Sequence, residues 1–317
     1  MKFQKILSIG IAENKLEPKY WERLDKLTEQ RVMLSQDSPE IKIQISNADC
    51  LLINPFVFKV NKELIDVAPS LKFIGVLATG FGVVDHEYAA TKDITVCNIP
   101  GYATESVAEL AIAILLEYTR DIEYAKQLAR KGNYSDVPRV PVYEIKAKKL
   151  GIIGTGRIGS RVAEISLALG AEVFYWSINK KPELEAKGVI YQEVEKIISE
   201  CDFVSLHLAL NKDTEGFMNE TFINKMKSGA ILLNLSPNEL VDFNALEKRL
   251  AKGDLIYIAD HTDEMTPEQI KQLSQYKDFI PYPPIGYQTV EATALKQEIF
   301  VGNIENFLKG EPTNKVN

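Results

Sequence analysis

Hydrophobic and polar positions divide the first hundred residues into two kinds of segment. Short apolar runs, typical of buried strands, alternate with stretches in which apolar residues recur at the spacing of an amphipathic helix. This pattern predicts strands at residues 5–10, 49–54, 71–77 and 94–98, and helices at 18–28 and 61–67. Such alternation is typical of a parallel sheet covered by helices.

A second alternation begins at Leu150. It predicts a helix at residues 158–169 and strands at 151–154, 172–176, 201–208, 230–235 and 255–259. An amphipathic helix should then run over residues 289–308, with Gly310 as its stop. A chain of 317 residues is long enough for two domains, so we expect an α/β protein with two doubly wound parallel sheets.

One long helix between the two alternations is apolar around most of its circumference. Ser106 and Glu109 form a possible capping box at its start, and it should end near Arg120. Its apolar positions are Val107, Leu110, Ala111, Ile114 and Leu115. A helix of this kind must be buried, either in a domain core or in an interface between two copies of the chain. A homodimer is therefore one prediction from the sequence.

Composition and charge exclude several classes of protein. Hydrophobic residues make up 45% of the chain and charged residues 26%, which is typical of a globular protein. The net charge of −7 argues against a nucleic-acid partner, because phosphate binding needs a clustered basic surface. The longest apolar stretch, residues 107–116, is interrupted by Glu109 and is too short to span a membrane.

The cysteines and the N-terminal segment both indicate a cytoplasmic protein. Cys50, Cys97 and Cys201 are far apart and odd in number, so we interpret them as free thiols and not as disulfides or metal ligands. The apolar run at residues 6–12 is followed by Glu13 without a cleavage pattern, which fits a first strand better than a signal peptide. We expect no metal and no membrane partner.

The strongest local motif is the sequence Gly-Thr-Gly-Arg-Ile-Gly at residues 154–159. It follows an apolar strand and opens a helix, which is the context that a dinucleotide-binding loop requires. In such a loop Gly154 permits a tight turn, Gly156 lets a pyrophosphate approach the backbone, and Gly159 lets helix and strand pack closely. The alternative is a glycine-rich turn that only packs.

The end of the next strand bears on the choice between NAD and NADP. A carboxylate about 20 residues after the glycine loop would bind the ribose hydroxyls of NAD, but residues 175–181 contain none. Ser177, Asn179 and Lys180 could instead receive a 2′-phosphate, which favours NADP slightly. The alternative is that Lys180 and Lys181 are simply solvated.

Several longer motifs resemble one family over essentially the whole chain. They are LATGFGVVD at residues 77–85, GYATESVAE at 101–109, the glycine loop, DFVSLHLA at 202–209, MKSGAILLN at 226–234 and GEP at 310–312. Together they resemble the D-isomer-specific 2-hydroxyacid dehydrogenases, especially the glyoxylate and hydroxypyruvate reductase branch.

The resemblance implies a domain arrangement. Residues 1–100 plus 290–317 would form a flavodoxin-like substrate domain, and residues 101–289 a Rossmann cofactor domain, with the active site in the cleft between them. Family members are usually dimers joined through the long helix after residue 103. The partner implied for the site is a small-molecule substrate.

The resemblance also assigns binding roles to individual residues. At the cofactor pyrophosphate it places Thr155, Gly156, Arg157 and Ile158, and by the adenosine ribose Ser177. On the adenine side it places His207, Ala209 and Thr214. At the nicotinamide end it places Leu235 and Asp260. Thr79 and Gly80 would present their backbone to a substrate carboxylate.

The sequence departs from the family at its three catalytic positions. The family uses an arginine after Asn-x-Ser to clamp the substrate carboxylate, a glutamate five residues after the aspartate matched to Asp260, and a histidine within Pro-His-Ile-Gly to donate a proton. Here these positions are Pro237, Met265 and Pro284. Since a general acid typically contributes 10²–10⁴-fold, ordinary 2-keto acid reduction by this triad should be nearly abolished.

His261 is the candidate for a replacement proton donor. It follows Asp260 at the end of a predicted strand and lies close in sequence to Asp263 and Glu264. The alternative is that it packs or caps the strand end. His86 and His207 are interpreted as structural residues, and Tyr282 and Tyr287 as weaker donors or packing residues. Arg139 is a weak candidate for an arginine that enters from elsewhere.

Two classes of function remain open from the sequence. The first is an NAD- or NADP-dependent oxidoreductase whose rebuilt site acts on a small carbonyl, imine or alcohol. The second is a nucleotide-binding pseudoenzyme or redox sensor, because the cofactor positions match the family whereas the catalytic triad does not.

Overall fold

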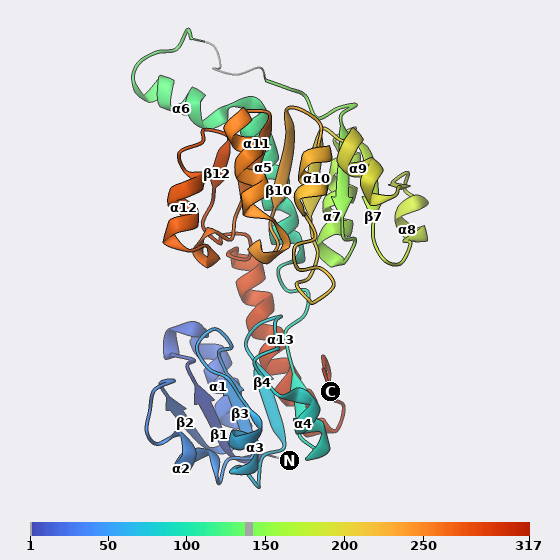
Figure 1. The fold of residues 1–317 in the computed structure, drawn as a ribbon. Coiled ribbons are helices and arrows are strands. Elements are labelled where there is room, and N and C mark those ends of the chain that lie inside the picture. The colour runs from blue at the N-terminus through green and yellow to red at the C-terminus, as the bar shows by residue number, and fades with distance from the viewer. Residues whose placement is uncertain (1, 137–141) are drawn as a thin grey trace. The chain divides into compact units, whose positions relative to one another are not determined.

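The computed structural model describes residues 2–136 and 142–317. The chain divides into two compact units, here called unit 1 (Met1–Tyr102 with Thr289–Asn317) and unit 2 (Ala103–Gln288). Each unit holds one parallel sheet with helices on both faces, as the sequence predicts (Figure 1). No helix of the described residues is both long and apolar enough to span a bilayer.

The sheet of unit 1 has the order β2-β1-β3-β4-β5. Its strands are β1 (Phe3–Ile9), β2 (Thr28–Leu34), β3 (Cys50–Ile53), β4 (Phe73–Val76) and β5 (Thr95–Cys97). All neighbours pair in parallel. The chain order reverses beside β1, so the point between β1 and β3 is a topological switch point, as in flavodoxin-like folds.

Helices bury both faces of this sheet. Trp21 and Leu24 of α1 (Pro18–Lys26) share one core with Phe300 of α13 (Val290–Lys309). The opposite core takes residues from α2 (Ile41–Ile45), α3 (Lys62–Asp66) and α4 (His86–Thr91). The C-terminal helix is thus part of unit 1, and Gly310 ends it in a left-handed conformation, as predicted.

The sheet of unit 2 has the order β12-β11-β10-β9-β6-β7-β8, and its switch point lies between β6 and β9. Its strands are β6 (Lys149–Ile153), β7 (Glu172–Trp176), β8 (Ile190–Tyr191), β9 (Phe203–Leu206), β10 (Ala230–Asn234), β11 (Leu255–Ala259) and β12 (Phe279–Pro281). Ligands of doubly wound sheets bind at the carboxyl ends of such strands.

Two sets of helices cover this sheet. One core includes α5 (Thr104–Arg120) and α7 (Arg157–Ala168). The other includes α9 (Val194–Glu200), α10 (Glu220–Lys225), α11 (Phe243–Lys252) and α12 (Pro267–Leu273). The remaining helices are α6 (Ile122–Arg130), α8 (Pro182–Glu185) and three short 3₁₀ turns, η1 (Glu13–Lys15), η2 (Asn238–Leu240) and η3 (Thr262–Glu264).

The predicted capping box on the long helix is wrong. α5 begins at Thr104, two residues before Ser106, and its first turn has no side-chain cap. The Ser106 hydroxyl is buried and donates instead to the carbonyl of Gly286, a partner that local sequence cannot reveal.

The apolar face of α5 is buried within unit 2. Ile114 and Leu115 are each only 2% exposed, and they share a core with residues of α7. Packing within one copy of the chain therefore accounts for the apolar face of α5, and burial of this face does not require a dimer. The homodimer stays a prediction that rests on the family resemblance.

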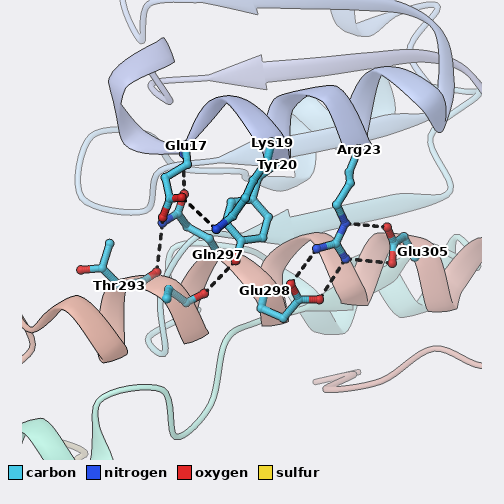
Figure 2. A network of polar contacts seen from close by, with 9 residues as sticks. Glu17, Lys19, Tyr20, Arg23, Thr293, Gln297, Glu298 and Glu305 are labelled. Carbon is cyan, nitrogen blue, oxygen red and sulfur yellow. Dashed lines mark hydrogen bonds and ion pairs between the residues drawn. The ribbon is translucent and has the colours of Figure 1, made fainter.

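A charged network joins α1 to α13 (Figure 2). The Arg23 guanidinium donates to Glu298 at 2.6 and 3.0 Å and to Glu305 at 2.9 and 3.0 Å. Because Glu298 and Glu305 are two helical turns apart on α13, one arginine fastens a long stretch of the C-terminal helix to the first helix. Gln297 adds a second link, since its side-chain oxygen accepts from the backbone N–H of Glu17 at 2.5 Å.

We expect Arg23→Met to destabilise the protein by about 1–2 kcal/mol, because it removes paired charge-assisted bonds and leaves two carboxylates facing each other. Urea unfolding measures the loss of stability. This loss should be smaller in 1 M NaCl, because salt screens the repulsion between the two remaining carboxylates. Lys19→Met is the matched control on the same helix, since its ion pair with Glu17 is exposed and should contribute little to stability. Equal losses for both variants would contradict the assigned role of Arg23.

Candidate functional site

The glycine loop between β6 and α7 has three glycines with three different constraints. Gly154 has φ +94°, and a Cβ there would lie 2.7 Å from the carbonyl oxygen of His207. A Cβ on Gly159 would overlap the carbonyl oxygen of Gly154. At Gly156 a Cβ would meet nothing within 4 Å, so the backbone there borders open space. The loop is therefore close-packed at both ends and accessible in the middle.

The accessible centre of the loop is also the start of α7. Gly156 is the N-cap residue, and no side chain caps the helix. The first N–H groups of the helix are thus available to a ligand, and the helix dipole favours a negative one. Arg157 is exposed at the first helical position. This arrangement can hold a pyrophosphate.

The loop after β7 lies beside the glycine loop, because Ile153 and Trp176 are paired at the ends of their strands. The Thr155 hydroxyl donates to Ser177 at 2.8 Å, and the Ser177 hydroxyl donates to the carbonyl of Asn179 at 2.6 Å. Lys180 lies with its ammonium 4.5 Å from the centre of the Tyr191 ring. Lys180 therefore contacts an aromatic ring as well as solvent.

His207 follows β9, the strand next to β6, and is held as a neutral side chain. Its Nε2 lies 2.8 Å from the hydroxyl of Ser205, and desolvation lowers the pKa of His207 to about 4. In the segment that follows, the Thr214 hydroxyl donates to the carbonyl of Ala209 at 2.7 Å and fixes that turn. A histidine that is neutral at pH 7 is unsuited to donate a proton, so His207 shapes the loop.

The ends of β10 and β11 place Leu235 and Asp260 next to each other in the fold, since Asn234 pairs with Ala259. Leu235 is buried, and Asp260 is 3% exposed. The Asp260 Oδ1 atom finds no hydrogen-bond donor among the described residues. Burial raises the pKa of Asp260 to about 6, although the neighbouring His261 opposes this rise.

His261 lies between two carboxylates. Its Nε2 is 3.4 Å from Asp260 Oδ1, and its Nδ1 is 3.4 Å from Glu264 Oε1. The imidazole is 28% exposed, so solvent or a small ligand can reach it. Burial raises the pKa of Glu264 as well. The cluster can hold and exchange a proton at the carboxyl end of β11.

Asn238 positions this cluster, and sequence reasoning did not identify it. Its side-chain N–H donates to the backbone carbonyl of His261 at 2.5 Å, and the residue itself is buried. The two residues are 23 positions apart and lie in the segments that follow the neighbouring strands β10 and β11, so no local motif signals the contact. The sequence signal that could have identified Asn238 is its polar side chain directly after Pro237, at one of the family's catalytic positions.

The three family catalytic positions hold no acid, base or cation. Pro237 caps η2, Met265 is 6% exposed in the core of unit 2, and Pro284 lies in the turn before Gly286. The Cβ position of Gly286 is 3.1 Å from Asp260 Oδ2, so that turn packs against Asp260.

The remaining candidates have ordinary surroundings. Tyr282 donates from its hydroxyl to Glu117 at 2.7 Å, and burial raises its pKa above the usual range. Tyr287 is 39% exposed. In unit 1 the His86 Nδ1 lies 3.3 Å from the Val84 carbonyl, and its ring meets Phe81 edge-on. Arg139 lies outside the described residues.

The turn after β4 in unit 1 contains Thr79 and Gly80. The Thr79 hydroxyl donates to the carbonyl of Ile99 at 2.9 Å, and its own carbonyl accepts from Asn98 at 2.7 Å. A Cβ on Gly80 would meet nothing within 4 Å. The turn is thus fixed by Thr79 and open at Gly80. Within the described parts of the chain, no group of His, Cys, Asp and Glu could hold a metal ion.

Residues 112–286 match the family described as D-isomer specific 2-hydroxyacid dehydrogenase, NAD binding domain. The chain belongs to the D-isomer-specific 2-hydroxyacid dehydrogenase family. The match covers the glycine loop and the ends of β7 to β11, so the segment that carries the candidate site is the family's nicotinamide-binding domain.

Relatives extend the similarity to both units. A hydroxypyruvate reductase of Blautia hydrogenotrophica is 36% identical over 309 residues, which cover 94% of each chain. A glyoxylate reductase of Thermococcus litoralis is 38% identical and covers 82% of this chain and 81% of its own. The crystal structure of D-lactate dehydrogenase from Aquifex aeolicus, complexed with NAD and lactic acid, is 28% identical over 96% of both chains with a TM-score of 0.82. Homologues of this family are nicotinamide-dependent reductases of small molecules.

Two glycine variants separate ligand binding from folding. Gly156→Val should cost no more than about 1 kcal/mol of stability, because its side chain enters open space, but it should abolish nicotinamide binding by blocking the approach to the backbone. Gly159→Ala should cost about 1–3 kcal/mol by overpacking. Thermal unfolding and NADPH fluorescence titration measure the two effects. A Gly156→Val protein that binds like the unmodified one would rule out the loop as the pyrophosphate site.

Proposed function

We propose that the protein is an NAD(P)-dependent oxidoreductase of a small carbonyl or imine, or of the corresponding alcohol, in which His261 is the proton donor. The observation that carries the proposal is the imidazole of His261 held between Asp260 and Glu264 at the carboxyl edge of the sheet that begins with the glycine loop. Unit 1 would serve as the substrate domain and unit 2 as the cofactor domain.

The cofactor follows the carboxyl edge of the sheet in this proposal. Its pyrophosphate binds at Thr155 to Gly159, and its adenosine part is bound by Ser177, His207, Ala209 and Thr214. Leu235 and Asp260 hold the nicotinamide end. β11 is three strands from β6, which corresponds to about 14 Å at the usual strand spacing. This separation supports a position of His261 at the nicotinamide end of the proposed site and away from the phosphates. The bound nicotinamide supplies the hydride.

His261 supplies the proton that reduction requires at the substrate oxygen or nitrogen. An imidazole is suited to this task because it exchanges a proton near neutral pH. Carboxylate oxygens of Asp260 and Glu264 each lie 3.4 Å from one of its two ring nitrogens, and Asn238 donates to its backbone carbonyl. The cluster thus combines a proton source with groups that orient it.

The family's usual substrates should be poor ones. Pro237 offers no cation to polarise a substrate carbonyl, and Pro284 offers no proton. We expect glyoxylate, pyruvate and hydroxypyruvate to be turned over at least 10³-fold more slowly than by a family member with the full triad.

A pseudoenzyme that senses nicotinamide redox state is the second candidate. It is favoured by the joint replacement of all three triad positions, while the cofactor positions of the sequence still match the family. Such a protein would bind reduced cofactor without oxidising it.

The role of His261 is tested by His261→Ala, with His86→Ala in unit 1 as the matched control. We expect His261→Ala to lower kcat at least 100-fold on the best carbonyl of a broad panel, with unchanged affinity for NADPH, because a general acid contributes this much. His86→Ala should stay within twofold of the unmodified protein. Steady-state kinetics and NADPH titration give both quantities. An unchanged kcat would contradict the assignment of His261 as the proton donor and would indicate that it only packs.

The cofactor preference is tested by Ser177→Asp. The loop after β7 has no carboxylate to repel a 2′-phosphate, so NADPH should bind at least as tightly as NADH to the unmodified protein. The new carboxylate should weaken NADPH at least tenfold and leave NADH unchanged or tighter. Lys180→Ala should weaken NADPH alone, with Lys187→Ala as a control outside the loop. A strong NADH preference of the unmodified protein would overturn the NADP assignment.

A further inference from the structure

The segments that follow β10 and β11 form a carboxylate cluster, here defined as Glu239, Asp260, Asp263 and Glu264. Burial raises the pKa of Asp260 most, and the negative charges of Asp263 and Glu264 raise it further. Burial and the charge of Glu239 likewise raise the pKa of Glu264. Within the part of the chain that the structure describes, no lysine or arginine forms an ion pair with any of the four. Four carboxylates thus share one imidazole, that of His261, and the cluster attracts positive charge.

Two buried oxygens at this cluster have no hydrogen-bond donor among the described residues. They are Oδ1 of Asn238, which is 5% exposed, and Oδ1 of Asp260, which is 3% exposed. The carboxamide of Asn238 cannot be turned over to satisfy its oxygen, because its nitrogen donates to the carbonyl of His261 at 2.5 Å. Asp260 Oδ1 lies 3.4 Å from Nε2 of the same histidine. Both side chains are thus directed at His261, and a ligand that donates N–H groups there would satisfy oxygens whose burial otherwise costs free energy.

A metal ion does not fit this arrangement. Among the residues that the structure describes, no group of three or more His, Cys, Asp and Glu is placed to hold one. Hard cations such as Mg²⁺ and Ca²⁺ need about six oxygen ligands gathered around one point. The cation that fits is therefore organic, with N–H groups that donate to separate oxygens, as those of an ammonium or a protonated imine do.

The turn after β10 has the wrong charge for an anionic substrate. At residues 237–239 it reads Pro-Asn-Glu, so an amide and a carboxylate follow the position at which the family's arginine is expected. A substrate carboxylate near His261 would meet like charge from Glu239 and Glu264, which is unfavourable. The replacement of the arginine thus changes the sign of the charge that the site accepts, and does not only remove a catalytic group.

We propose that the carboxylate cluster binds a protonated imine, whose N–H groups donate to the free oxygens of Asp260 and Asn238. The inference rests on the proposed function and narrows its substrate class to imines. His261 protonates the imine nitrogen, hydride from the reduced nicotinamide adds to the carbon, and the π electrons of the C=N bond become the lone pair of the amine. The imine is thus reduced and the cofactor oxidised by the same two electrons. A ketone oxygen takes no proton near neutral pH, so the carboxylates stabilise no such cation on a carbonyl substrate.

Pyrrolidine binding to the NADPH-loaded protein, measured by calorimetry, tests this site without any turnover. Pyrrolidine is a cyclic amine that is positively charged at neutral pH, and cyclopentanol is a neutral compound of similar shape. We expect pyrrolidine to bind at least about tenfold more tightly than cyclopentanol, and to lose most of this advantage in about 1 M NaCl.

A matched pair of variants assigns this preference to the cluster. Glu264→Gln should weaken pyrrolidine by about fivefold or more, because it removes one carboxylate and keeps the shape of the side chain. Glu268→Gln is the control, since Glu268 is exposed on α12 outside the cluster, and it should leave the affinity unchanged. The melting temperature and the NADPH affinity should not change in either variant. With turnover, the cyclic imine 1-pyrroline should be reduced at least about tenfold faster than cyclopentanone.

Three outcomes would overturn the inference. They are an unmodified protein that binds pyrrolidine no more tightly than cyclopentanol, a Glu264→Gln protein that binds it normally, and equal losses in Glu264→Gln and Glu268→Gln. Failure of the proposed function gives a different result. If pyrrolidine binds in a Glu264-dependent manner but no imine or carbonyl is reduced, the cation site stands and the oxidoreductase proposal falls. If cyclopentanone is reduced and pyrrolidine does not bind, the oxidoreductase proposal stands and the imine assignment falls.

Discussion

The close approach of backbone to backbone around the glycine loop is the constraint on which the site depends. α7 can start beside β6 only because Gly159 has no Cβ to collide with the carbonyl of Gly154, and Gly154 itself presses against the carbonyl of His207. This packing fixes the loop at both ends and leaves the N–H groups near Gly156 facing open space. Since β6, β9, β10 and β11 are consecutive neighbours, the same sheet then sets where His207, Leu235 and Asp260 lie relative to the loop.

Charges in this molecule divide into those that hold the fold and those that remain available. Arg23 is paired with both Glu298 and Glu305, and its role is to fasten α13 to α1 within unit 1. Asp260 differs, because its buried Oδ1 atom accepts no hydrogen bond from the described residues and lies 3.4 Å from the imidazole of His261. Buried polar groups are normally satisfied, so this oxygen is a physical indicator of where a ligand acts.

The sequence predicted the fold well because strands and helices with clear periodicity depend on local pattern. β7 and β11 have the predicted bounds, and the glycine loop lies between a strand and a helix as its motif requires. β2 was missed because it is an edge strand with polar residues exposed along it, and β8 and β12 because they are only two and three residues long. Long-range partners were also missed. Ser106 bonds to Gly286, and Asn238 bonds to His261.

The central claim is that this family member still transfers a hydride although its triad is replaced. The most direct measurement is rapid mixing of NADPH-loaded protein with a broad panel of small carbonyls and imines, followed through the absorbance of the bound nicotinamide in a single turnover. Our account predicts that at least one compound discharges the bound NADPH. If NADPH binds tightly and no compound oxidises it, the protein is a nucleotide-binding sensor and the catalytic account is contradicted.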